Sequence, residues 1–280
     1  MLDYLSVINS DSMLLKRTKE DICLLCLDNK ATKLNSHILP KFLTKGVLSG
    51  TGNKHAFLIG ANKRQKVQDT PKQDYLFCPS CEKRFEILET YISNKFFNRF
   101  RNTAFKDEFV ITKEGYSFMN EPDVMHPNSI DENLFHLFFY SIIWRASISD
   151  HDVYSSFKID PDQEEILRLS LNIFMKNDLA ELKKYCNHSQ SEIHKFNYSV
   201  TTCFTKPISG YIGVYNLENG RYLLYANSIA VVYDFKETHN VPGYNRPGKK
   251  IEILMITESA WQNHRLSTIV NTLIRWRDVE

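Results

Sequence analysis

The sequence contains no run of 18 or more apolar residues, and this absence argues against a helix that crosses a membrane. Its first residues, Met-Leu-Asp-Tyr-Leu, lack the basic block and the apolar block of a signal peptide. Internal repeats and low-complexity tracts are absent too. With 42% apolar and 24% charged residues, the composition is typical of a globular protein, which we expect in the cytoplasm.

Acidic residues are missing from one long segment. Between Lys30 and Lys66 there are eight Lys or Arg residues and no Asp or Glu, although the net charge of the whole chain is only +2. A locally basic surface attracts polyanions such as nucleic acid. A solvated basic loop without a partner is the alternative. The side chains expected to bind the phosphate backbone are Lys41, Lys45, Lys63, Arg64 and Lys66.

Cysteine is sparse, and its spacing is informative. Four of the six cysteines form two Cys-x-x-Cys pairs, Cys23 with Cys26 and Cys78 with Cys81. In a reducing cytoplasm this spacing favours metal binding over disulfides. Two such pairs complete a tetrahedron around zinc, with Zn–S distances of about 2.3 Å and no open position, so the predicted Zn²⁺ is structural. Cys186 and Cys203 stand alone, and we expect both to be packing residues.

Three helices are predicted from apolar spacing and capping residues. The first begins at the second cysteine pair and buries a stripe made of Phe85, Leu88, Ile92 and Phe96. The second, Leu134–Ile148, is apolar nearly all round and is expected to be buried, with Arg145 paired inside it. The third has Asp160 as N-cap, Pro161 at its first position and Gln163 closing a capping box. Its buried stripe is expected to contain Leu167, Leu171, Phe174 and Leu182.

The last third of the chain predicts strands. Tyr211–Tyr215 and Arg221–Tyr225 flank Asn219-Gly220, a strong hairpin signal. Further strands are expected at Ile229–Phe235 and Ile251–Ile256, and a final helix near Trp261–Trp276. The predicted fold class is α+β. Its expected parts are a zinc-bound module with its following helix (1–111), a connection (112–130) and a mixed helix and antiparallel-strand domain (131–280).

The residues around the cysteine pairs carry a resemblance. They are Ser36-His37-Ile38-Leu39-Pro40-Lys41-Phe42 and Cys78-Pro-Ser-Cys81-Glu82, with Glu89 and Trp144-Arg145-Ala146-Ser147 further on. This pattern resembles the HNH, or ββα-metal, nucleases, in the branch where four cysteines tie a β-hairpin to a helix. Phage Holliday-junction resolving enzymes and bacterial restriction and defence nucleases belong to that branch. The pattern is most similar to a group of uncharacterised bacterial HNH proteins, several of which look like anti-phage effectors. The resemblance covers residues 20–95 and then only 144–147.

The resemblance implies roles for two residues. His37 takes the place of the general base that removes a proton from water, and an imidazole suits this task because it titrates near neutrality. Glu82 takes the place of a ligand for a catalytic Mg²⁺ or Mn²⁺. One carboxylate with phosphate oxygens and waters is a common shell for Mg²⁺.

The pattern also departs from the family. The position before the histidine is Asp in well-studied members and Ser36 here, and a hydroxyl is the weaker metal ligand. Glu86 and Glu89, one and two turns after Glu82, are candidates to complete the metal site. Glu89 is about 10 Å from Glu82 along the helix axis, so Glu86 reaches the same ion more readily. Gln73 stands where the family has its middle Asn, and it is expected to orient the histidine by a hydrogen bond.

The predicted function is therefore a metal-dependent endonuclease that acts on nucleic acid, DNA in preference to RNA, in bacterial defence. The alternative is a zinc-ribbon module that binds nucleic acid or protein without chemistry; such a module has no use for His37 with Glu82. A RING scaffold needs eight ligands, and a rubredoxin does not suit the long basic segment. Residues 131–280 are expected to sense a signal or to bind a partner protein.

Overall fold

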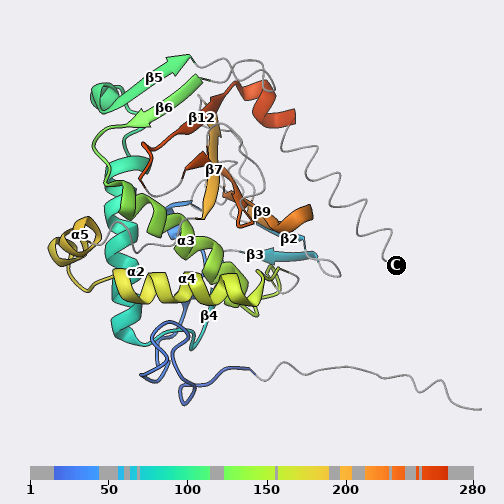
Figure 1. Ribbon diagram of the computed structural model, residues 1–280. Coiled ribbons are helices and arrows are strands. Elements are labelled where there is room, and N and C mark those ends of the chain that lie inside the picture. Colours follow the sequence, from blue (N-terminus) through green and yellow to red (C-terminus); the bar gives the residue numbers. More distant parts are fainter. Residues whose placement is uncertain are drawn as a thin grey trace, which may run out of the picture.

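The computed structural model describes most of the 280 residues, namely 16–43, 56–59, 64–67, 70–113, 123–154, 157–188, 196–203, 212–226, 229–236, 244–245 and 248–263. Within these segments helices pack against one large sheet, and there are two small two-stranded sheets besides (Figure 1). The mixed α+β class predicted from the sequence is confirmed. No helix in this part of the chain is long and apolar enough to cross a membrane.

The large sheet has eight strands in the segments that the structure describes. They are β5 Phe109–Lys113, β6 Asp123–Pro127, β7 Asn197–Cys203, β8 Ile212–Asn216, β9 Arg221–Ala226, β10 Ile229–Asp234, β11 Tyr244–Asn245 and β12 Ile253–Ile256. The order is β5-β6-β12-β7-β10-β9-β8, and β11 also pairs with β7. Only β12 and β7 pair in parallel among these strands, while the other pairs are antiparallel.

Two two-stranded sheets belong to the N-terminal part. β1 Ser36–His37 pairs with β4 Lys72–Gln73, and β2 Ala56–Ile59 pairs with β3 Arg64–Val67. Both pairs are antiparallel. Of the basic residues predicted to bind nucleic acid, Arg64 and Lys66 lie in β3, whereas Lys45 and Lys63 lie outside the described residues.

In the described segments, the other layer contains the helices α2 Pro79–Ile92, α3 Glu132–Ile148, α4 Pro161–Phe174 and α5 Leu179–His188. The helix predicted at the second cysteine pair is α2, and its apolar stripe is buried as expected. Residues 93–97 continue it as a short π-helix that includes the buried Phe96. The segment with the first cysteine pair lies at the N-terminal end of α2 (Figure 1).

Helix α3 is the centre of the core, as its uniformly apolar sequence predicts. Its residues 133–147 are all buried. Tyr233 from β10 donates its hydroxyl to the Phe139 carbonyl at 2.9 Å, which joins α3 to the sheet. On the other side, the Trp144 ring lies 5.9 Å from Phe77 and 6.4 Å from Phe85. Aromatic pairs of this kind each contribute about 0.5–1.5 kcal/mol beyond area burial, so α3 holds the region of the second cysteine pair against the sheet.

The segment 112–130, predicted to be a connection, differs from that expectation. It contains the last residues of the edge strand β5 and all of β6, which pairs with β5 on one side and with β12 on the other. The sequence pattern does not reveal them, because Val110 and Ile111 of β5 are apolar yet exposed, and β6 contains His126 and Pro127. One hydrophobic cluster includes residues from both sides of this segment.

Local signals elsewhere are confirmed, with two corrections, the first being that the buried Leu182 belongs to α5 and not to the helix that begins at Pro161. Asn219 and Gly220 both adopt positive φ, 61° and 69°, between β8 and β9. Asp160 caps α4 as predicted, but its own N–H donates to the hydroxyl of Tyr222 at 3.1 Å. The tyrosine in turn donates to Gln163 at 3.4 Å, so a residue of β9 stands where a direct capping box was expected. A helix covers 258–263, and the rest of the predicted final helix lies outside the described residues.

Candidate metal centre and the polar site beside it

The two cysteine pairs converge on one point. The sulfur atoms of Cys23, Cys26, Cys78 and Cys81 all lie within 4.8 Å of one another. Tetrahedral zinc with Zn–S distances of about 2.3 Å requires sulfurs about 3.8 Å apart, so this donor set fits one zinc ion. Within the part of the chain that the structure describes, no other group of three or more His, Cys, Asp or Glu side chains brings its ligand atoms together.

Local backbone geometry explains the convergence. The first pair lies in a turn in which the Leu27 N–H donates to the Cys23 carbonyl at 3.0 Å, and Leu27 adopts a φ of 55° that closes the turn. In the second pair, Cys78 is the N-cap of α2, and its sulfur accepts from the Cys81 N–H at 3.5 Å. The helix start thus presents Cys81 in its first turn, one residue before Glu82.

The surroundings of the cluster favour the thiolate form of one cysteine, Cys23. The pKa of Cys23 is lowered to about 4 by a hydrogen bond from the Cys81 thiol and by backbone N–H groups of Cys26, Cys78 and Leu25. The pKa of Cys81 is raised in turn, because its proton is the one donated to Cys23 and because the thiol is buried. A thiolate is the form of cysteine that binds metal. Cys186 and Cys203 are buried in the core, which confirms their predicted packing role.

The pairing of β1 with β4 brings the segment that contains His37 to the start of α2. Ile38 and Leu39 are fully buried and anchor the end of β1 in the core. Ser36 is also fully buried, and its hydroxyl donates to Glu82 Oε2 at 3.0 Å. The residue predicted as a weak second ligand therefore contacts the predicted ligand Glu82 directly. His37, the next residue, is half-buried.

Three glutamates, Glu82, Glu86 and Glu89, lie on one face of α2, beginning one residue after Cys81. Burial raises the pKa of Glu82, while the hydrogen bond from Ser36 and the positive charge of Arg145 oppose the rise. Burial also raises the pKa of Glu89, again against the effect of Arg145. Glu86 is exposed on the helix surface. The site is therefore rich in negative charge, which a single buried arginine partly balances.

Arg145 is the paired arginine that the sequence predicted inside the buried helix. Its Nη2 atom lies 2.6 Å from Glu89 Oε1 in an ion pair whose side chains are 3% and 20% exposed. Its Nη1 atom donates to the carbonyl oxygen of His37 at 3.0 Å. Sequence reasoning named both partners but missed their connection; the signal available was a lone charge in an apolar run, which is informative wherever it is buried.

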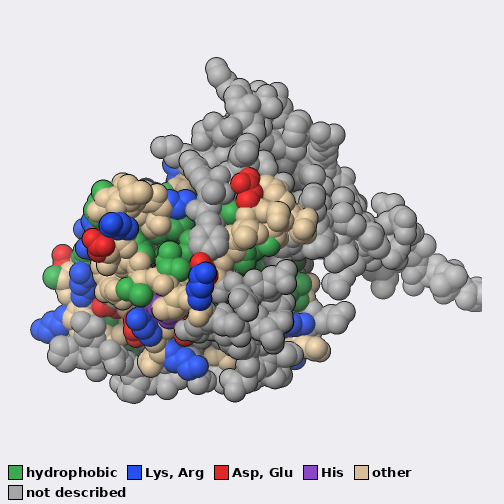
Figure 2. Space-filling view, turned by 90° about the horizontal axis from the view of Figure 1, so that it is seen from above, with side chains coloured by type: hydrophobic (Ala, Val, Ile, Leu, Met, Phe, Trp, Pro, Cys, Tyr) green, Lys and Arg blue, Asp and Glu red, His purple; other side chains and the backbone are tan. Residues whose placement is uncertain are grey.

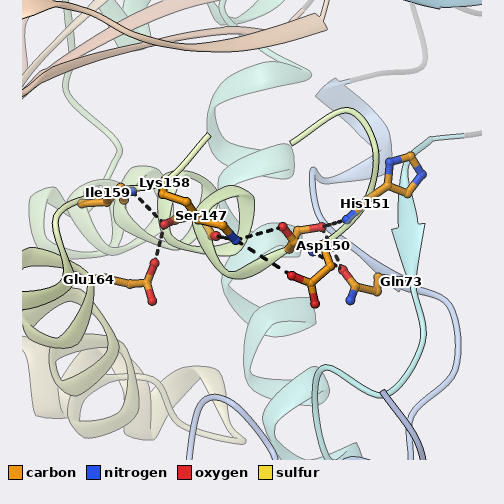
Figure 3. Close-up of polar contacts among 8 residues, drawn as sticks. Gln73, Ser147, Asp150, His151, Lys158, Ile159 and Glu164 are labelled. Atoms are coloured by element: carbon orange, nitrogen blue, oxygen red, sulfur yellow. Dashed lines mark hydrogen bonds and ion pairs between the residues drawn. The ribbon is translucent and has the colours of Figure 1, made fainter. Parts of the chain in front are cut away.

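Gln73 contacts the loop after α3. Its side-chain oxygen accepts hydrogen bonds from Ser149 Oγ and from the Asp150 N–H, both at 2.9 Å (Figure 3). In the β1–β4 pairing, Gln73 is opposite Ser36, and the residue opposite His37 is Lys72. Neighbouring positions of a strand face opposite sides, so this pairing puts Gln73 with Ser36 rather than with the imidazole it was predicted to orient.

The same loop is fixed at its other end. The Lys158 ammonium donates to the carbonyls of Ser147 and Ser149 at 2.6 and 3.3 Å, where α3 ends (Figure 3). A cation at a helix C-terminus satisfies carbonyls that have no partner within the helix. The Ser147 hydroxyl contacts Glu164 of α4 and accepts from the Ile159 N–H. The end of α3 is thus connected both to α4 and to the β1–β4 pair, which contains His37.

The predicted phosphate-binding residues are only partly described. Lys41 is exposed just after β1. On the face drawn in Figure 2, basic and acidic side chains of the described residues are interspersed rather than gathered by sign. Arg145 is buried and ion-paired, so its guanidinium is not available to bind a phosphate backbone.

No protein-family model, curated protein or solved structure matches this chain.

Proposed function

We propose that this protein is a metal-dependent endonuclease of the HNH type that hydrolyses phosphodiester bonds, in DNA in preference to RNA, and that it serves in bacterial anti-phage defence. The observation that carries the proposal is the contact between Ser36 and Glu82. It links the strand of the proposed base to the helix start of the proposed metal ligand, directly beside four clustered cysteines. The setting in defence rests on the sequence resemblance.

The proposed chemistry assigns one task to each group. The imidazole of His37 takes a proton from water, the resulting hydroxide attacks phosphorus, and the bond to the 3′ oxygen breaks. A Mg²⁺ or Mn²⁺ held by Glu82, with Glu86 within one helical turn, would stabilise negative charge on the phosphate and on the leaving oxygen. A Zn²⁺ held by the four cysteines is structural, because sulfur fills all of its positions.

The direct test of the proposal is cleavage by the purified full chain. Supercoiled plasmid, linear DNA and RNA are incubated with Mg²⁺ or Mn²⁺, with EDTA as the control. We expect nicking or cutting of plasmid that requires the added metal. Tight binding of nucleic acid without any cleavage would instead support the zinc-ribbon binding module.

Glu82→Gln is expected to reduce cleavage about a hundredfold or more, because metal stabilisation of the transition state is worth several kcal/mol. Its stability should not fall. Burial raises the pKa of Glu82, so the folded protein binds this proton more tightly than the unfolded chain does. At neutral pH the ionised carboxylate therefore costs folding free energy, a cost that is absent below the unfolded pKa and that the amide removes. Initial rates and thermal unfolding at pH 7 measure both effects.

A matched control separates this role from a plain helix-start carboxylate. Glu181 is the acidic residue in the first turn of α5 and is exposed. Glu181→Gln should leave cleavage unchanged and should lower stability slightly, since a negative charge near a helix N-terminus is favourable. Metal-dependent cleavage that persists in Glu82→Gln would reassign the ligand to Glu86 or Glu89.

The basic segment is expected to bind the phosphate backbone. Changing Lys41, Lys45 and Lys66 together to Gln should weaken DNA binding about equally across sequences. It should also flatten the dependence of log K on log salt by roughly 0.9 per lost phosphate contact. The control changes Lys106, Lys113 and Lys249, which are exposed elsewhere in the fold. Salt-titrated binding decides, and an unchanged slope in the first variant would place the phosphate contacts on another surface.

A further inference from the structure

Arg145 contacts three elements, through two hydrogen bonds and one ion pair. It is the charged residue of a helix whose residues 133–147 are all buried, and its side chain is 3% exposed. Nε donates to the Ser141 carbonyl one turn earlier in α3 at 3.2 Å. Nη1 reaches the backbone of β1 and Nη2 reaches α2, through the contacts with His37 and Glu89. All three nitrogen atoms are thus engaged, each by a different element.

The shape of the guanidinium makes this arrangement specific. The group is planar, and its nitrogens form a rigid fork, so fixing two of its contacts fixes the direction of the third. Its central carbon lies 4.7 Å from the centre of the Phe85 ring, which holds the plane from one side. A lysine ammonium carries the same charge on a flexible stem and has no such fork. Arg145→Lys therefore keeps the positive charge and removes the planar fork.

We propose that Arg145 is the positioning residue of the candidate nuclease site, and that it sets the backbone of His37 at a fixed place relative to Glu89 and the metal-binding side of α2. This inference rests on the proposed function. It adds that the site is complete only when α3 is packed on the zinc-bounded segment, because the arginine and His37 are 108 positions apart in sequence.

A second contact supports the same conclusion. The loop that follows α3 is attached to β4 through Gln73, whose strand is paired with that of His37. The end of α3 thus contacts both paired strands, β1 through Arg145 and β4 through Ser149. A buried ion pair by itself is weak evidence for stability. The contact to the His37 carbonyl is what gives this pair a role in the site.

The experiment compares Arg145→Lys with Arg84→Lys in the full chain. Arg84 is a suitable control because it also joins two helices, donating from α2 to the Asn172 carbonyl and side-chain oxygens at 3.4 and 3.1 Å. Plasmid cleavage is measured at varied substrate to separate kcat from KM. Independently, histidine-labelled protein is studied by NMR, with the His37 ring signals assigned from the His37→Ala spectrum.

For Arg145→Lys we expect kcat to fall about a hundredfold, the effect of a misplacement near 1 Å, with KM within about threefold of wild type. The His37 ring signals should shift, and zinc content should stay at wild-type level. Arg84→Lys should change neither kcat nor these signals. If Arg145→Lys does not fold, Glu89→Gln is used instead. This change removes the ion pair between Glu89 and the Arg145 guanidinium, and it should shift the same His37 ring signals.

The outcomes distinguish this inference from the proposed function. An Arg145→Lys protein that cuts at the wild-type rate would overturn the positioning role and leave the nuclease proposal standing. A wild-type protein that cuts nothing would end the nuclease proposal, and the NMR comparison would still decide whether Arg145 sets the place of His37. Unchanged His37 signals in the folded variant would overturn the inference in either case.

Discussion

Replacement of His37 by alanine is expected to lower the cleavage rate by about 10²–10⁴-fold, which is what a positioned general base contributes. The side chain is half-buried at the end of a two-residue strand, whereas its neighbours Ile38 and Leu39 supply the buried anchor. Its removal should therefore leave the melting temperature and the zinc content close to wild type. Cleavage rates at saturating DNA and metal, measured beside elemental analysis, test both parts.

His151→Ala is the matched control for this change. His151 is also half-buried, in the loop after α3, and its Nδ1 atom accepts from the Val153 N–H at 3.3 Å. It has no part in the proposed reaction, so the variant should cut at nearly the wild-type rate. If His37→Ala cuts as fast as wild type, another group removes the proton. Equal loss in both variants would point to a shared structural effect.

Signals that depend on a few neighbouring residues predicted their elements well. The start of α4 follows from Asp160 and Pro161, because an N-cap oxygen and a preset φ act within one turn. The turn at Asn219 and Gly220 follows from the ease with which both residues adopt positive φ. The buried helix α3 follows from its uniformly apolar sequence.

Elements that depend on distant pairing were missed. Strand β7 lies at the middle of the large sheet and pairs with β10, β11 and β12, yet four of the seven residues in its sequence Asn-Tyr-Ser-Val-Thr-Thr-Cys are polar. Even Thr202 is fully buried there. Tertiary packing decides whether such a segment forms a strand, because β-propensity is strongly dependent on context.

The candidate site was predictable residue by residue but not contact by contact. Cysteine spacing alone predicted that four thiols meet, and the structure brings them together. The hydrogen bond from Ser36 to Glu82 joins positions 46 apart, and no periodicity in the sequence encodes it. The resemblance gave the serine the place of a weak metal ligand, whereas in the structure its buried hydroxyl donates to the glutamate.

Cys78→Ser is expected to abolish zinc binding and to leave the N-terminal segment unfolded or insoluble. Cysteine-bound structural zinc contributes about 10–16 kcal/mol to the folding of small zinc modules, so the loss of one ligand removes much of the stability of this segment. The change is informative because Cys78 is also the N-cap of α2. Serine is among the best N-cap residues, so any loss reports on the missing sulfur ligand and not on the missing cap.

Cys203→Ser provides the comparison, since Cys203 is also buried but lies in β7 and does not belong to the cluster of four cysteines. It should cost some packing energy and keep about one zinc per chain by elemental analysis. Because Cys81 and Glu82 are adjacent in the first turn of α2, Cys78→Ser should also lose cleavage, although its sulfur takes no part in the reaction. A wild-type protein that is soluble, fully folded and free of zinc would contradict the metal centre. It would also remove the framework on which the nuclease proposal depends.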